Sequence, residues 1–320
     1  MKIKQFMSLT VQKTTLFFVS VVVFLVPAVL RPQSQNLPLE HWAYSFLDRL
    51  QTRGLYISED FDTRPYSREA VAEIISQIDK RAKADPTLLS KVEWGLFEQL
   101  KGEFHEELEN TSQSIVIRKK EYEPHLFSYR NEDIVVHWDG LLSHQNKIES
   151  KKVVDRSLPS ALSFVGLNLR ANIKKSLAIF AQGGTFFLSD ADSLTADSFN
   201  PSLGLPVTKN ALVDVTVTDQ TIAYLVFRLP WLDVEAGRDM IEWGPGFRGN
   251  LALSRNSNVY DMFKFDFRYK RFKFESFHAF LNAEDAKYLA GHRLEIRPSS
   301  NVQFALSETV VYGNRSVEFL

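Results

Sequence analysis

The stretch GRDMIEWGPGFRGNLALS, residues 237–254, holds the residues of this chain that are best suited to chemistry. It brings two arginines and a glutamate close to a tryptophan along the sequence. Arginine and carboxylate groups can hold sugar hydroxyls or uronates, and an indole ring can stack on a pyranose face. We therefore predict glycan-binding roles for Arg238, Glu242, Trp243 and Arg248.

A tight bend lies within the same stretch, at Gly244, Pro245 and Gly246. Proline fixes its own φ and supplies no hydrogen-bond donor, whereas glycine permits turns that are closed to other residues. We expect these three residues to form a structural loop, either facing inward or lying at a rim. In the alternative interpretation, Trp243 fills a gap and the glycines make a re-entrant bend.

An acidic pair offers the one arrangement that could suggest catalysis. Asp233 and Glu235 lie two residues apart on a predicted strand, so their Cα atoms are ~6.6 Å apart. This separation overlaps that of the carboxyl groups in inverting glycosidases. Any acidic pair at this spacing on a strand has it, so we favour charges that pair with basic residues on neighbouring strands.

The remaining chemistry is sparse. The seven histidines show neither the HxH nor the HxxxH spacing of metal sites, and there is no GxSxG, phosphate-binding loop or dinucleotide fingerprint. With no cysteine, the chain has neither disulfides nor thiolate zinc sites. We expect no catalysis, no metal and no cofactor.

The balance of basic and acidic residues limits the classes of binding partner. With 38 basic and 39 acidic residues, the net charge is −1. Nucleic-acid binding needs a clustered basic face, which this sequence does not suggest. We expect no nucleic-acid partner.

The N-terminus predicts export. Lys2, Lys4 and Lys13 precede the apolar run TLFFVSVVVFLVPAVL, residues 15–30. A basic start followed by a short apolar core is the pattern of a secretory signal peptide, which we place at 1–30. The cleavage site lacks a clean small-x-small pattern, so a retained anchor is the alternative. In both cases the rest of the chain leaves the cytoplasm.

Residues 37–108 have the apolar spacing of helices. Their HWAY and RPYSREAVAEII strings resemble the S-layer-homology pattern, a module that commonly contacts cell-wall polymers. The match covers about 40 residues in a single copy, and short motifs are unreliable by themselves. We favour a small periplasmic helical region that packs on its neighbour.

From residue 113 to 320 the apolar pattern changes to period two. FKFDFRY, residues 263–269, places three phenylalanines and a tyrosine on one face and charged residues on the other. About a dozen such segments alternate with short and long turns. A soluble β-sandwich would bury the apolar face, and an outer-membrane β-barrel would turn it toward lipid. We favour the antiparallel transmembrane barrel.

The strings GRDMIEWGPGFRGNLALSRNS and HRLEIRPSSNVQFALSE resemble the Wzi-type capsule assembly proteins. The resemblance covers about 113–320 and is strongest from 232 to 307. It implies an outer-membrane β-barrel with a helical periplasmic part and a lectin-like role without catalysis. Barrels of this family have more strands than this chain supplies, and the chain stops within a predicted strand. We therefore expect a barrel that is incomplete at its C-terminus, or a smaller relative.

These observations lead to one functional expectation. The chain would be a monomer in the outer membrane, in contact with lipid, that binds or organises capsular or other surface polysaccharide during capsule assembly. One alternative is an outer-membrane porin or exporter. The other is a secreted β-sandwich enzyme that acts on polysaccharide.

Overall fold

The fold is mainly β, with a few helices before the strands. The computed structural model describes residues 34–58, 62–111, 125–150, 157–174, 177–189, 208–210, 215–246, 249–255, 257–282, 287–299 and 302–313. Residues 31–320 form one compact unit. The proposed signal peptide, 1–30, lies outside the described residues.

The helical region occupies the part of the chain for which helical spacing was predicted. Ser67 accepts a hydrogen bond from the Ala70 backbone and caps its helix, as its position before an amphipathic run suggests. The apolar stripes meet in one core, which also includes Met240 from the second half of the chain. The elements are α2 (Ala43–Thr52), α3 (Arg68–Ala84), the 3-10 turn η1 (Pro86–Leu88), α4 (Lys91–Glu103) and α5 (His105–Thr111).

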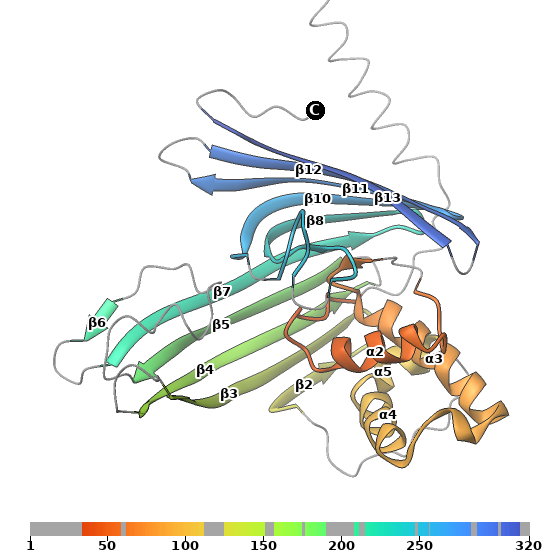
Figure 1. The fold of residues 1–320 in the computed structure, drawn as a ribbon, viewed down its shortest axis with the longest axis horizontal. Coiled ribbons are helices and arrows are strands. Elements are labelled where there is room, and N and C mark those ends of the chain that lie inside the picture. The colour runs from red at the N-terminus through yellow and green to blue at the C-terminus, as the bar shows by residue number, and fades with distance from the viewer. Residues whose placement is uncertain are drawn as a thin grey trace, which may run out of the picture. The chain divides into compact units, whose positions relative to one another are not determined.

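An antiparallel sheet of 11 strands follows, in the order β13-β12-β11-β10-β8-β7-β5-β4-β3-β2, with β6 beside β7 (Figure 1). Among the described residues these ladders make an open path. A second, two-stranded sheet joins β1 (Thr63–Arg64) to β9 (Glu242–Trp243). The strands of the large sheet are β2 (Phe127–Arg130), β3 (Ile134–Ser150), β4 (Ser157–Ile173), β5 (Leu177–Ser189), β6 (Thr208–Asn210), β7 (Val215–Arg228), β8 (Leu232–Asp239), β10 (Tyr260–Tyr269), β11 (Phe272–Asn282), β12 (Lys287–Ser299) and β13 (Val302–Tyr312).

In a soluble protein the apolar face of a sheet is buried and the charged face is exposed. In this sheet the charged face is buried and the apolar face is exposed. Along β10, Phe265 is 41% exposed, while its neighbours Lys264 and Asp266 are buried. The same alternation runs through the adjacent strands β8, β11 and β12. We call the exposed side of β7–β13 the aromatic face. The opposite side, the charged face, carries Arg228, Asp233, Glu235, Lys264, Asp266, Lys273, Glu275, Arg293 and Glu295.

The connections also alternate in length. At one end of the sheet the connections are short, with two residues between β10 and β11 (270–271) and two between β12 and β13 (300–301). At the other end, the connection between β8 and β10 takes residues 240–259. Among the described helices, none is both long enough and apolar enough to cross a membrane.

Candidate functional site

Ion pairs between adjacent strands hold the charged face together. Asp233 pairs with Arg228 on β7 and with Arg268 on β10, at 3.1 Å from the latter. Glu235 lies 2.8 Å from Lys264 on β10. The interpretation of this acidic pair as charges matched by basic neighbours is therefore confirmed.

The helical region contacts this network at Lys273, which lies on β11. The Lys273 ammonium is 3.2 Å from Asp266 and 3.8 Å from Glu275, and it donates a hydrogen bond to the hydroxyl of Thr63 on β1. A buried amine costs free energy unless oxygen atoms surround it. The Thr63 hydroxyl, from β1, therefore helps to stabilise the buried Lys273 ammonium of the large sheet.

The connection 240–259 folds back against the charged face, and we call it the re-entrant segment. Its strand β9 pairs with β1, so that Thr63 lies opposite Trp243 and Arg64 opposite Glu242. The backbone N–H of Gly244 donates to the carbonyl of Asp62 at 2.8 Å. Backbone pairing thus holds the re-entrant segment to the helical region.

Glu242 is fully buried and anchors this segment. Arg255 binds it in a bidentate manner, with both N–O distances at 3.1 Å. Asn250 donates to the same carboxylate at 3.1 Å, and Arg64 lies 3.7 Å away. A bidentate arginine fixes geometry as well as charge. Each of these contacts is made within the protein.

Trp243 is 1% exposed. Its indole N–H donates to Glu275 Oε1 at 2.5 Å, and its ring meets Phe277 edge-to-face with centroids 5.3 Å apart. Gly291 makes room for this contact, because a Cβ there would lie 2.8 Å from the indole. In this conformation the indole faces contact protein and are not available for stacking on a sugar.

The other predicted site residues lie apart from this buried pair. Arg238 is on the aromatic side of β8, where it binds Asp261 with N–O distances of 2.7 and 2.5 Å. Arg248 lies outside the described residues. The structure therefore brings Glu242 and Trp243 together, but it does not bring Arg238 to them.

The predicted bend at Gly244, Pro245 and Gly246 forms a turn within the re-entrant segment. Gly244 has a φ of 120°, a conformation that favours glycine. Pro245 is exposed, and the N–H of Gly246 donates to the side chain of Asn250 at 2.7 Å. Asn250 therefore connects the bend to Glu242, a role that its type and position did not reveal.

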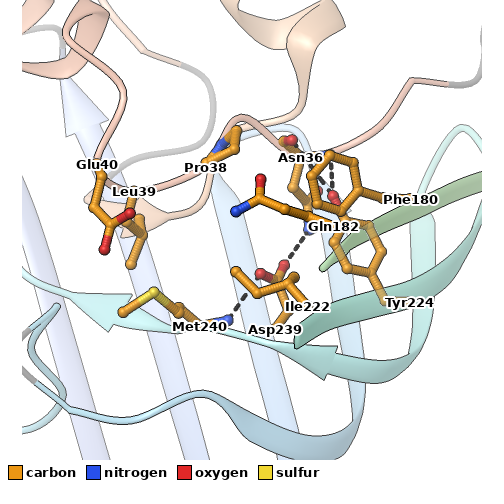
Figure 2. A pocket seen from close by; sticks show the side chains of 10 residues that line it. All are labelled: Asn36, Pro38, Leu39, Glu40, Phe180, Gln182, Ile222, Tyr224, Asp239 and Met240. Carbon is orange, nitrogen blue, oxygen red and sulfur yellow. Dashed lines mark hydrogen bonds between the residues drawn. The ribbon is translucent and has the colours of Figure 1, made fainter. Parts of the chain in front are cut away.

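Residues 34–37 insert against the charged face, which the sequence did not predict. The Asn36 amide donates to Glu235 at 2.8 Å and to Asp239 at 2.9 Å, and its oxygen accepts from Arg228 at 2.7 Å. Figure 2 shows Asn36 beside Asp239 at the wall of a small pocket. The pocket volume of about 10 Å³ is roughly the space one water needs, too small for a sugar ring.

Helix α5 contacts the first strands of the sheet through Glu106. Its carboxylate lies 2.9 Å from His137 on β3 and also pairs with Arg130 on β2. Burial alone raises the pKa of Glu106. The hydrogen bond and charge of His137, with the charge of Arg130, outweigh that effect and lower the pKa to about 2. The packing of the helical region on its neighbour is confirmed.

The described side chains include no group of three or more His, Asp or Glu residues arranged to hold a metal ion. His137 lies against His125, with ring centroids 4.1 Å apart and the ring planes tilted by 32°. His125 contacts Asp139 at 2.9 Å. Each imidazole is thus held by a carboxylate in a contact between elements.

These features define a class: an antiparallel β-sheet protein with an exposed aromatic face, whose charged face is covered by a helical region and a re-entrant segment. Residues 165–318, just under half of the chain, match the family model described as capsule assembly protein Wzi. The match spans most of the sheet and confirms the resemblance in the sequence. Comparisons with curated proteins and with solved structures gave no match.

Proposed function

We propose that this chain is a non-catalytic outer-membrane protein that binds or organises capsular or other surface polysaccharide. Its strands would form a barrel with the aromatic face toward lipid and the charged face toward the interior. The match to a capsule assembly family supports the biological setting.

One observation carries the membrane part of this proposal. The aromatic side chains of β10 and β11 are exposed while the charged side chains between them are buried. Water would disfavour so large a contiguous apolar surface, and lipid would favour it. A soluble sandwich would need a second layer over this face, and the described residues include none. Short and long connections at opposite ends of the sheet are also typical of such barrels.

The contacts over the charged face favour a closed interior over a diffusion pore. Asn36 from the segment before the helices, Thr63 from the helical region and Trp243 from the re-entrant segment each contact the charged face and are buried. Glu242 is also buried, and it holds the re-entrant segment through Arg64, Asn250 and Arg255. The porin alternative predicts ion conductance in planar bilayers, and we expect none from the full chain.

For polysaccharide contact we retain residues 238–248, with two kinds of role. Glu242 and Trp243 would position the segment from their buried sites. Arg238 is one residue from the end of β8, where the re-entrant segment begins, so it would contact the glycan beyond the lipid-facing part of the strand. Arg248 would contact the glycan from the segment itself, since guanidinium groups bind hydroxyls and uronates well.

The test is retention of surface polysaccharide by cells that carry variants of the assembled protein. Arg238→Ala and Arg248→Ala should lower retention while the amount of protein in the membrane stays the same. Arg271→Ala is a matched control, because Arg271 lies in a short turn at the other end of the sheet and contacts Pro298. Unchanged retention in the double arginine variant would reject the proposed contacts.

A further inference from the structure

The aromatic face of strands β10–β13 also carries polar side chains, among them a histidine and a glutamate that pair with each other, His292 and Glu308. Direct pairing places the outward side chains of these strands in five rows, two residues apart along each strand, and the first, middle and last of them differ in composition. The row near the short turns is Tyr269, Phe272, Ile296 and Phe304. The row near the long connections is Asp261, Phe280, Tyr288 and Tyr312. The row midway between them is Phe265, Ser276, His292 and Glu308.

Glu308 therefore lies midway between two rows rich in aromatic residues. Four residues of strand separate it from each of them, or ~13 Å along the strand. Aromatic rows mark the two interfaces of a membrane barrel, so the midway row corresponds to the centre of the bilayer. The Glu308 side chain is 70% exposed.

The surroundings of Glu308 are apolar. Along β13 its outward neighbours are Leu306 and Val310, and Leu294 lies beside Leu306 on β12. Its described contact is His292, whose Nδ1 lies 3.1 Å from Glu308 Oε1. An acidic side chain at this depth costs free energy unless a polar group covers it, and acyl chains supply none.

We propose that the outward face of β12 and β13 is the contact surface for a second copy of this chain, with His292 and Glu308 at its centre. This inference rests on the membrane location proposed above, and it departs from the monomer that the sequence led us to expect. The occupant at this depth must offer a donor to Glu308 and an acceptor to His292. A second copy carries both.

The geometry of the pair suits a two-fold contact. His292 and Glu308 are direct partners on adjacent strands, so they lie side by side. A two-fold axis along the membrane normal, running between β12 and β13, places each His292 opposite the Glu308 of the other copy. The contact is then self-complementary, as a two-fold interface requires. Leu294 and Leu306 of one copy would meet Leu306 and Leu294 of the other.

Cysteine cross-linking tests this contact well, because the chain contains no cysteine. Leu306→Cys, in native membranes treated with a short membrane-permeant bis-maleimide, should give a dimer, since facing sheets are ~10 Å apart. Leu225→Cys is the matched control, because Leu225 is also exposed on the aromatic face but lies on β7. It should stay monomeric.

A second substitution separates self-association from simple exposure to lipid. Adding Glu308→Leu to Leu306→Cys should weaken the association about a hundredfold, and lower the cross-linked fraction with it, because the two-fold contact loses two charge-assisted hydrogen bonds at about tenfold each. Without a partner, the same substitution removes a charge from lipid, so it would stabilise the barrel and leave cross-linking unchanged.

The outcomes distinguish this inference from the proposed function. Membrane-embedded protein that gives no dimer through Leu306→Cys would overturn the contact and leave the membrane location intact. A cross-linked species whose mass exceeds that of the monomer by something other than a second copy would also overturn it. Protein found outside the membrane fraction would contradict the proposed function itself.

Discussion

Replacing Trp243 distinguishes a buried anchor from a sugar-stacking platform. The indole is 1% exposed, donates to Glu275 and packs against Phe277. Trp243→Ala removes the whole ring from a packed site, which costs about 3–5 kcal/mol in the free energy of unfolding. Trp243→Phe keeps an aromatic ring but leaves a buried carboxylate without its donor, at a cost of about 1.5–3 kcal/mol.

The assay is urea unfolding of the purified protein in detergent, followed by circular dichroism. The account predicts that the midpoint falls in the order wild type, Trp243→Phe, Trp243→Ala. Polysaccharide retention should fall only as far as the amount of assembled protein falls. A Trp243→Ala protein with a wild-type midpoint and lost retention would refute the burial argument and favour direct stacking on the glycan.

Three further predictions follow from the same contacts. Gly291→Ala should destabilise the protein, because its Cβ would meet Phe277 at 2.3 Å, and its unfolding midpoint in urea should drop as for Trp243→Phe. Asn36→Ala should cost about 1–3 kcal/mol, measured in the same way, because two carboxylates and a guanidinium lose a buried partner. The stabilisation from Glu106 should be complete above its ordinary pKa of 4.5 and disappear as the pH falls toward 2. Melting temperature should therefore fall across this window in the wild type and fall less in Glu106→Gln. Equal profiles would contradict the role of Glu106.

The sheet was the most predictable part of the fold. Side chains alternate across a strand with period two, so FKFDFRY alone assigns Phe265 and Lys264 to opposite faces. The structure adds which face is exposed, which depends on contacts from distant parts of the chain. A two-residue turn at Lys270 and Arg271 follows this stretch, and Lys270 adopts the positive φ of 54° that such a turn needs.

The contacts between distant segments were less predictable. An aspartate followed by proline is typical of a helix start, but Asp85 and Pro86 begin a 3-10 turn, and α4 starts after Ser90. Ser90 and Glu93 form a reciprocal capping box there, and this gives the later start. Nothing in the local sequence marks Asn36 as a partner of strand β8, since that contact exists only once the chain has folded.

The central claim is that the aromatic face contacts lipid while the charged face lies inside. The most direct test attaches a fluorophore to a cysteine at one of two positions. Phe265→Cys lies on the aromatic face, and Ser307→Cys lies on the charged face, where the native Ser307 hydroxyl accepts a hydrogen bond from Arg293. Each protein is reconstituted in vesicles and quenched by brominated acyl chains or by iodide in the water. The account predicts strong quenching by brominated lipid at residue 265 and little at residue 307. Quenching of residue 265 by iodide alone would contradict it.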